Sequence, residues 1–101
     1  MKTEYISSFI KDLGALKGSH YYEKIKTMVF EDIPKLPDID KVKNLRKLKN
    51  NKPYYRIRIG EYRIGVRLNN NTLVFMRVLH RKDIVKQIRF SKNLHTPGPS
   101  F

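Results

Sequence analysis

The stretch YYRIRIGEYRIGVR, residues 54–67, decides the fold prediction, because both of its halves alternate apolar and charged side chains. Such alternation is typical of strands with one buried and one exposed face, since successive side chains of a strand point to opposite faces. The dipeptide GE between the halves begins with a glycine that suits a tight two-residue turn. We therefore predict an antiparallel hairpin with strands at about 54–59 and 62–68.

The register set by this turn puts the apolar residues on one face of the hairpin and the arginines on the other. Arg58 then lies opposite Arg63, and Arg56 lies opposite Gly65. Like charges facing each other across a ladder are destabilising, so folding alone does not explain this pattern. Two guanidinium groups can bind one phosphate between them, and a glycine leaves room for a ligand backbone. We predict that this face binds a phosphate-rich ligand, with Tyr54 beside it as a stacking residue.

The composition indicates one small domain with a single hydrophobic core. The chain has 101 residues, of which 40% are hydrophobic, and it contains no cysteine. Disulfides and thiolate metal sites are therefore excluded. The longest purely apolar run, LVFM at 73–76, is far shorter than a membrane span or a signal-peptide core. We expect a soluble, cytoplasmic protein that does not enter a membrane.

The net charge of +13 is distributed unevenly along the chain. Residues 1–40 contain six basic and seven acidic residues, whereas residues 41–101 contain sixteen basic and two acidic residues. Such one-sided charge causes self-repulsion unless a polyanion or an acidic partner neutralises it. A phosphate-rich ligand, an acidic protein partner, or both, explain it better than solubility does.

Two helices are predicted before the hairpin. Residues 8–18 and 19–36 each show an apolar stripe at helical spacing, with Ser8 and Ser19 as N-caps. The short connection between them predicts an antiparallel helical hairpin. Asp12 is expected to be a solvated helix charge. The predicted stripes are Phe9, Leu13 and Leu16 in the first helix, and Tyr22, Ile25, Val29 and Ile33 in the second.

The other segments complete an α+β fold, with the helical hairpin packed on a twisted antiparallel sheet. A short strand is predicted within MKTEYIS, residues 1–7, and a central strand, LVFMRVLH, at 73–80. The connection before the hairpin is expected to dock as a helical turn or an edge strand. A short helix, RKDIVKQIRF at 81–90, ends a single domain over residues 1–90, and residues 91–101 are expected to be a flexible tail.

The basic part of the chain lacks the groups that metal-dependent nucleases use. Such chemistry needs clustered carboxylates, and here only Glu61 and Asp83 are present. There is no P-loop, zinc spacing or dinucleotide fingerprint, so we expect no metal and no cofactor. Metal-free cleavage of RNA remains open, because the substrate's 2′-hydroxyl is its own nucleophile. Arginines can then stabilise the transition-state charge, while a histidine such as His80 can move protons.

Several motifs together resemble the RelE/ParE superfamily of type II toxin–antitoxin toxins. They are SFIKDL at 8–13, VKNLRKLK at 42–49, YYRIRIGEYRIGV at 54–66 and RVLHRKDI at 77–84, and the resemblance covers about residues 2–90. It implies a compact toxin neutralised by an acidic antitoxin from the same operon, in a toxin–antitoxin hetero-oligomer. RelE-like members cut mRNA in the A site of the 70S ribosome without a metal, whereas ParE-like members poison DNA gyrase.

The resemblance also implies roles for individual residues. Arg63 matches the arginine at the scissile phosphate, and His80 and Arg81 match basic residues of the RNA-cutting members. Many relatives carry a proton-transferring tyrosine where this chain has Val85, so His80, Lys47 or Lys49 must assist, or cleavage is slow or absent. The predicted catalytic residues are Arg63, His80 and Arg81, and the predicted RNA-binding residues are Lys47, Lys49, Tyr54, Arg56, Arg58 and Lys82.

Three functions follow from these observations. The first is a ribosome-dependent mRNA endonuclease, favoured by the combination of Arg63, His80 and Arg81. The second is a ParE-like inhibitor of DNA gyrase. The third is a non-catalytic RNA-binding or ribosome-binding relative, which Val85 suggests.

Overall fold

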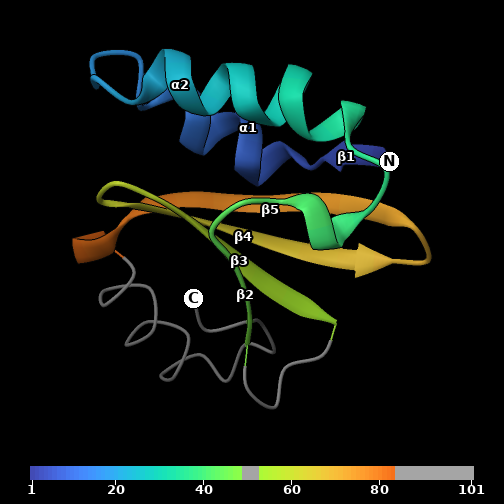
Figure 1. Cartoon of the computed structure of the whole chain (residues 1–101). Coiled ribbons are helices and arrows are strands. Elements are labelled where there is room, and N and C mark those ends of the chain that lie inside the picture. The colour runs from blue at the N-terminus through green and yellow to red at the C-terminus, as the bar shows by residue number, and fades with distance from the viewer. Residues whose placement is uncertain (49–52, 84–101) are drawn as a thin grey trace.

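The computed structural model describes residues 1–48 and 53–83 and shows a mixed α+β domain (Figure 1). The chain begins with a short strand and two helical segments and ends with a run of strands. The elements, in chain order, are β1 (Lys2–Tyr5), α1 (Ser7–Gly14), α2 (Tyr22–Thr27), the π-helical turn η1 (Met28–Asp32), the 3₁₀ turns η2 (Ile33–Lys35) and η3 (Ile39–Lys41), β2 (Leu45–Lys47), β3 (Tyr54–Ile59), β4 (Tyr62–Asn69) and β5 (Thr72–His80).

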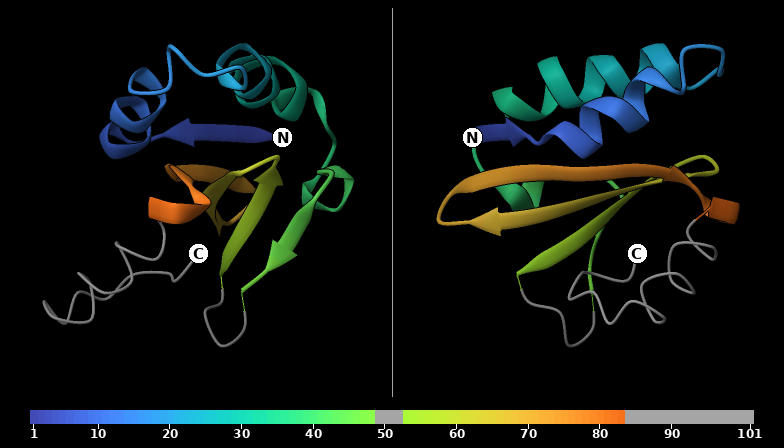
Figure 2. Two further views of the ribbon diagram at one scale, coloured as in Figure 1. Left: turned by 90° about the vertical axis from the view of Figure 1, so that its left-hand side faces the viewer. Right: turned by 180° about the vertical axis from the view of Figure 1, so that it is seen from behind.

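The strands form one five-stranded sheet in the order β1-β5-β4-β3-β2. Strands β2 to β5 are antiparallel neighbours, as predicted, whereas β1 runs parallel to β5. The helical layer and three strands separate β1 from β5 in the sequence, so no tight turn forces them to run in opposite directions. Figure 2 shows α1 and α2 side by side on one face of the sheet. The predicted fold class is therefore confirmed.

The hairpin register is the one that the alternating pattern predicts. Arg58 pairs with Arg63, Arg56 with Gly65 and Ile57 with Ile64. Gly60 begins the turn with φ +56°, a conformation that glycine adopts without strain. The apolar face of the hairpin is consequently buried, and the face that carries the arginines of β3 and β4 points away from the helices.

The core lies between the sheet and the helices. Ile25 of α2, Val29 of η1 and Ile33 of η2 follow one another at helical spacing and are buried. They pack against the apolar faces of β3, β4 and β5. Of the other predicted stripe residues, Phe9 and Leu13 are buried, whereas Leu16 and Tyr22 are half-buried and pack against the core. The core residues are Phe9, Leu13, Ile25, Val29, Ile33, Val42, Ile57, Ile59, Ile64, Val66, Leu73, Phe75 and Val78.

Neither predicted helix cap acts as predicted. Helix α1 begins at Ser7 after Ile6, and the Ser8 hydroxyl donates instead to the carbonyl of Met76 on β5. Ser19 accepts a hydrogen bond from the Tyr21 amide, but α2 begins only at Tyr22, with Tyr21 in the N-cap position. In both places a tertiary or turn contact replaces the local cap.

The prediction that Asp12 is solvated is wrong. Its carboxylate accepts two hydrogen bonds from the Arg77 guanidinium, at 2.6 and 3.1 Å, and one from the Val78 amide. The side chain of Asp12 is only 14% exposed. A register shift near Gly65 and Val66 accompanies this contact in the β4–β5 ladder. Asp12 therefore ties α1 to the part of β5 that β1 does not cover.

The connection before the hairpin supplies both of the elements that were left open. It forms the turn η3 and then the edge strand β2, with Val42 buried beneath it. Lys49, Val85, most of the predicted helix 81–90 and the tail 91–101 lie outside the described residues. No helix in the described part of the chain is long and apolar enough to cross a membrane.

Candidate nucleic-acid interface

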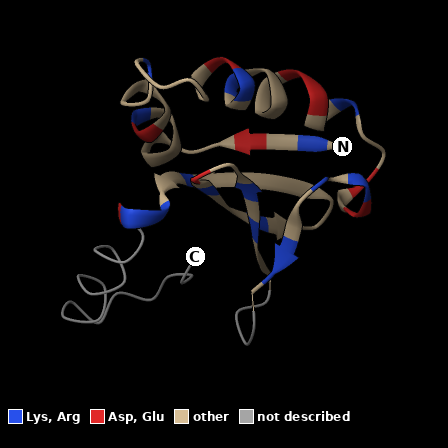
Figure 3. Cartoon of the chain, turned by 60° about the vertical axis from the view of Figure 1, so that its left-hand side comes forward, with Lys and Arg blue, Asp and Glu red and all other residues tan. Residues whose placement is uncertain are grey.

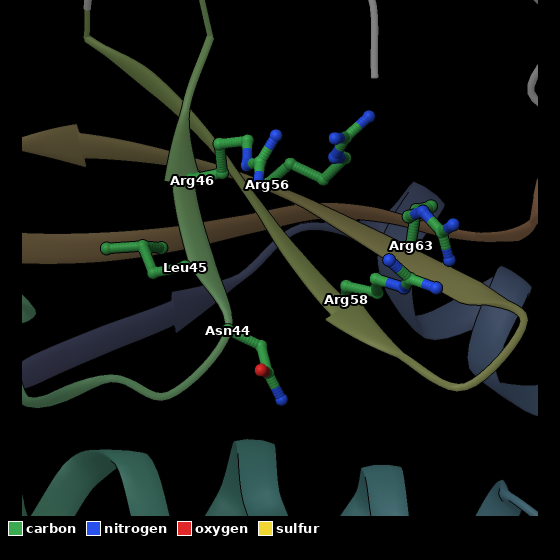
Figure 4. Close-up of a pocket in the computed structure, with 6 residues that line it drawn as sticks. All are labelled: Asn44, Leu45, Arg46, Arg56, Arg58 and Arg63. Atoms are coloured by element: carbon green, nitrogen blue, oxygen red, sulfur yellow. The ribbon is translucent and has the colours of Figure 1, made fainter.

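Four arginines from three neighbouring strands project from the sheet face opposite the helices. Arg46 comes from β2, Arg56 and Arg58 from β3, and Arg63 from β4. We call this set the arginine face. Together with Asn44 and Leu45 it lines an open groove of about 220 Å³ (Figure 4). Figure 3 shows the basic side of the molecule that these strands form, away from the mixed charges of the helical layer.

Strand pairing explains why these side chains lie together. Arg46 is the direct partner of Arg56 in the β2–β3 ladder, and Arg58 is the direct partner of Arg63 in the β3–β4 ladder. Direct partners in an antiparallel ladder project to the same face, with Cβ atoms about 5 Å apart. The groove is thus lined by two cross-strand arginine pairs, two residues apart along β3.

Arg63 is half-buried and is held at the hairpin turn. Its Nη1 donates to the carbonyls of Gly60 and Tyr62, both at 3.1 Å, which anchors the guanidinium beside the turn. Partial burial lowers the pKa of Arg63, and the neighbouring charges of Arg58, Arg56 and Arg81 lower it further. Each of these neighbours is positive, so this corner of the face favours an anion.

Among the described residues, no Asp or Glu side chain forms a salt bridge with the arginine face. The salt bridges that the described residues form join Asp12 to Arg77 and Glu61 to Arg81, and Glu61 also forms a hydrogen bond with His80. None involves the four groove arginines. Their guanidinium donors, apart from the Arg63 Nη1 bonded to the turn, are therefore available to a ligand.

Arg46 was missed by the sequence prediction, and Lys47, which was predicted to bind RNA, lies on the other side of β2. Lys47 pairs with Tyr55, and Leu45 pairs with Ile57; both Tyr55 and Ile57 belong to the helix-facing side. Lys47 is exposed, but it projects away from the groove. Treating β2 as a strand with Leu45 inward would have identified Arg46, because its neighbours on both sides then face the core.

Tyr54 lies at the end of the face that is farther from the turn. It pairs with Arg67 and is half-buried, so its ring is partly available for stacking. Gly65 is buried between Arg56 of β3 and Arg77 of β5 in the sheet register. It leaves the middle of the face without a side chain of its own.

His80 does not belong to the arginine face. It pairs with Tyr62 at the end of β5, and the two rings meet edge to face at 5.3 Å. Tyr62 in turn contacts Tyr21 of the helical layer. The His80 ring bonds to Glu61 and to the Lys82 amide. The structure therefore separates His80 from Arg63, which the predicted catalytic set had placed together.

Arg81 and Lys82 begin a helical segment, residues 81–83, directly after β5. Both side chains are exposed. Arg81 lies near the hairpin turn, since its amide donates to the Glu61 carbonyl at 2.8 Å and its charge affects Arg63. The described residues contain no group of three or more His, Cys, Asp or Glu side chains placed to hold a metal ion. The face thus offers positive charge and hydrogen-bond donors.

Comparison with known proteins identifies the family. The family described as "ParE toxin of type II toxin-antitoxin system, parDE" matches residues 4–85. Toxin RelE3 of Methanocaldococcus jannaschii is 40% identical over 85 residues, which cover 83% of this chain and 94% of that protein. The chain belongs to the RelE/ParE superfamily of type II toxins.

Solved structures agree with this assignment. This RelE/ParE member superposes with a TM-score of 0.73 on a chain of the RelB–RelE antitoxin–toxin complex from Methanococcus jannaschii, with 36% identity over 83% of this chain and 96% of that one. YafQ from E. coli shares the fold, with a TM-score of 0.64 and 20% identity over 82% of this chain and 96% of that one.

Proposed function

We propose that this toxin is a metal-free endoribonuclease that cuts mRNA on the ribosome and thereby stops translation. The observation that carries the proposal is the arginine face, in which two cross-strand arginine pairs line one groove and form no salt bridge within the described residues. Membership of the RelE/ParE superfamily supports it. A polyanion backbone is the ligand that such a face favours.

The chemistry we propose uses the RNA's own nucleophile. The 2′-oxygen forms a bond to the adjacent phosphorus and the bond to the 5′-oxygen breaks, which leaves a cyclic phosphate and a 5′-hydroxyl end. The 2′-hydroxyl loses a proton and the leaving oxygen gains one. Arg58 and Arg63 stabilise the extra negative charge on the phosphate oxygens; their direct pairing across β3 and β4, on the groove side, supports this role.

Proton transfer is the weaker part of this site. Lys47 lies on the other face, and both ring nitrogens of His80 are occupied. Lys49 is left as the candidate acid or base, and Val85 replaces the tyrosine of many relatives. We therefore propose slow cleavage that depends on the ribosome to align the substrate.

The partner we propose is an acidic antitoxin encoded in the same operon. The M. jannaschii chain that this toxin resembles was solved as an antitoxin–toxin complex. The excess of positive charge on residues 41–101 is the complement that an acidic segment would neutralise.

The test is to induce the toxin in cells and map the 5′ ends of translated messages. We expect growth arrest with new 5′ ends inside coding regions. Arg63→Ala should reduce cutting by about 10²- to 10³-fold, as for loss of one transition-state donor. Lys17→Ala, which removes one exposed charge from the helical side, is the matched control. Intact messages in arrested cells would contradict the proposal.

Inhibition of DNA gyrase is the second candidate. The match to the ParE family favours it, as does the absence of a histidine or lysine among the residues that line the described groove. It predicts cleaved DNA–gyrase complexes and a DNA damage response in arrested cells whose messages stay intact. If the toxin binds RNA in a salt-dependent way but produces neither effect, it is a non-catalytic binder.

A further inference from the structure

The ring of His80 bridges two segments that flank the arginine face. Its Nδ1 is 3.1 Å from the backbone nitrogen of Lys82, and its Nε2 is 3.2 Å from Oε2 of Glu61. A backbone amide can only donate, so Nδ1 must accept and carries no proton. The ring proton is then on Nε2, which donates to the Glu61 carboxylate. Both nitrogens are therefore used inside the protein.

The acceptor at Nδ1 makes His80 the N-cap of the segment that follows. Residues 81–83 are helical, and the side chain of the residue before them accepts a hydrogen bond from the second helical amide. This is the usual geometry of an N-cap, which satisfies one of the free donors at the start of a helix. His80 thus fixes the direction in which the chain leaves β5.

Glu61 connects this junction to the hairpin turn. Its carbonyl accepts from the Arg81 amide at 2.8 Å, and its Oε1 lies 3.9 Å from Nη2 of Arg81. Its other carboxylate oxygen is the one bonded to His80. Arg81 lies between His80 and Lys82 in the chain, and its two contacts with Glu61 keep it beside the hairpin turn that carries Arg63.

We infer that His80 is a positioning residue that, with Glu61, holds Arg81 at the turn end of the arginine face, and that it does not transfer the protons of the reaction. The part of the inference in which Arg81 binds RNA rests on the proposed function. The hydrogen bonds that His80 forms with Glu61 and Lys82 do not depend on it. Tyr62 supports the His80 ring from the side that faces the helices, opposite the groove. A ring in that position, with no free nitrogen, is poorly placed to reach a 2′-hydroxyl beside Arg63.

Two substitutions separate the roles of the two ring nitrogens. In His80→Asn the amide oxygen can replace Nδ1 as the cap, because asparagine is among the best N-cap residues. In His80→Gln the longer amide can replace the donor at Nε2 but not the cap. Neither amide can transfer a proton at neutral pH, whereas His80→Ala removes both contacts. His20→Asn, at an exposed histidine between α1 and α2, is the matched control.

The first measurements read the bridge directly by NMR. We expect the ring ¹⁵N signals of His80 to show a proton on Nε2 and none on Nδ1. The Lys82 amide should exchange slowly in the wild type and in His80→Asn, and about three- to tenfold faster in His80→Ala, as expected for loss of a cap. A proton on Nδ1, or equal exchange in all variants, would overturn the inference whatever the protein does to RNA.

The second measurement asks whether the bridge positions Arg81. The probe is a single-stranded 2′-O-methyl RNA, which cannot be cleaved. His80→Ala and Arg81→Ala should weaken binding by similar factors, and the double variant should be no weaker than Arg81→Ala alone. If the two factors by which the single variants weaken binding multiply in the double variant, or if His80→Ala has no effect on binding, the positioning role is refuted. This holds even if cleavage is observed in cells.

The last comparison separates positioning from catalysis. We expect His80→Asn, which keeps the cap at Lys82 but loses the bond to Glu61, to bind RNA better than His80→Ala and, if the toxin cuts mRNA, to retain cutting in the same proportion with an unchanged pH profile. If His80→Asn binds RNA better than His80→Ala but cuts as poorly, His80 transfers protons and the inference is wrong. If no variant cuts, the proposed function fails, and the NMR and binding results still decide the role of His80.

Discussion

At the scale of single residues, the pair formed by Arg58 and Arg63 shows the conflict between stability and function. The two are direct cross-strand partners, and Arg58 is exposed. Repulsion between like charges in such a position costs a few tenths of a kcal/mol. Arg63 also bonds to the turn carbonyls, so Arg58 is the better residue to replace.

We expect Arg58→Gln to raise the melting temperature by about 1–3 °C while it weakens RNA binding. Removing the charge relieves the repulsion of Arg63, whereas the ligand loses a guanidinium fork. Thermal unfolding and RNA titration of the same samples measure both effects. Arg58→Lys, which keeps the charge, should not be stabilised. A lower melting temperature for Arg58→Gln would show that this arginine contributes to folding.

Glu61 makes the stability of the folded protein depend on pH in the acid range. The hydrogen bond from His80 and the positive charges of Arg81 and Lys82 lower the pKa of Glu61 below its ordinary value of 4.5. A carboxyl whose pKa is lower in the folded state stabilises the fold above its unfolded pKa, and this contribution is lost as the pH falls through the folded value.

The melting temperature of the wild type should therefore decrease more between pH 5 and pH 3 than that of Glu61→Gln. The difference should be small, because the carboxylate is exposed and its interactions are screened by solvent. Thermal unfolding across this pH range measures it. Parallel curves for the two proteins would mean that the bridge to His80 and Arg81 contributes nothing to stability.

At the scale of elements, the β3–β4 turn is held by the helical layer. Gly60 has φ +56°, and a Cβ added there would lie 2.4 Å from the ring of Tyr21. The same turn provides both carbonyls that anchor Arg63. The conformation of the turn, and with it the placement of Arg63, therefore depends on Tyr21.

Gly60→Ala should lower the melting temperature by about 5–10 °C, since the left-handed conformation alone costs about 1–2 kcal/mol and Tyr21 must also move. The control is Gly18→Ala, where an added Cβ meets nothing within 4 Å. We expect Gly18→Ala to change the melting temperature little. Equal effects of the two substitutions would contradict the contact between Tyr21 and the turn.

Strand β2 offers a comparison between its two faces. Arg46 lines the groove, whereas Lys47, the next residue, projects to the other face. Arg46→Gln should weaken binding of single-stranded RNA severalfold and reduce the dependence of log K on log salt by about 0.7, the value for one phosphate contact. Lys47→Gln removes the same charge and should leave this slope unchanged. Equal slopes for both variants would place Arg46 outside the contact.

The sequence predicts those elements whose pattern is local. The hairpin register follows from strict alternation and a glycine turn, and the structure confirms it pair by pair. The helix starts were predicted incorrectly, because Ser8 bonds to Met76 in a distant strand. The ion pair of Asp12 with Arg77 and the parallel direction of β1 were missed for the same reason. Contacts between segments far apart in the chain leave no periodic signal.

The same difference between local patterns and long-range contacts applies to the predicted binding site. Arg56, Arg58 and Arg63 were placed together correctly, because one hairpin carries all three. In β2 the sequence prediction named Lys47 and missed Arg46, because a strand of three residues is too short to show its alternation. His80 is the last residue of β5, and the side that it faces depends on pairing with Tyr62, which the sequence pattern does not reveal.

At the scale of the whole molecule, the helical layer and the sheet differ in charge. The acidic residues of the chain lie mostly in residues 1–40, which form β1 and the helices, whereas β2, β3 and β4 carry the groove arginines. The core between these layers separates the two charge environments. A polyanion is consequently attracted to one side of the molecule, and this side is the arginine face.

This separation predicts how RNA binding responds to salt. If the four groove arginines each neutralise one phosphate, log K should fall with log salt with a slope of about −3, or about fiftyfold between 50 and 200 mM. Replacing Arg46, Arg56, Arg58 and Arg63 together by glutamine should remove most of this slope. The charge-matched control replaces Lys11, Lys17, Lys24 and Lys26, all exposed in the helical layer.

The control lowers the net charge by the same four units, so the comparison separates local contact from general attraction. We expect it to keep the wild-type slope, because its charges lie across the core from the groove. Fluorescence anisotropy with 2′-O-methyl RNA at several salt concentrations measures all three proteins without cleavage. If both quadruple variants lose the slope equally, RNA responds to the total charge of the molecule, and the arginine face is not its binding site.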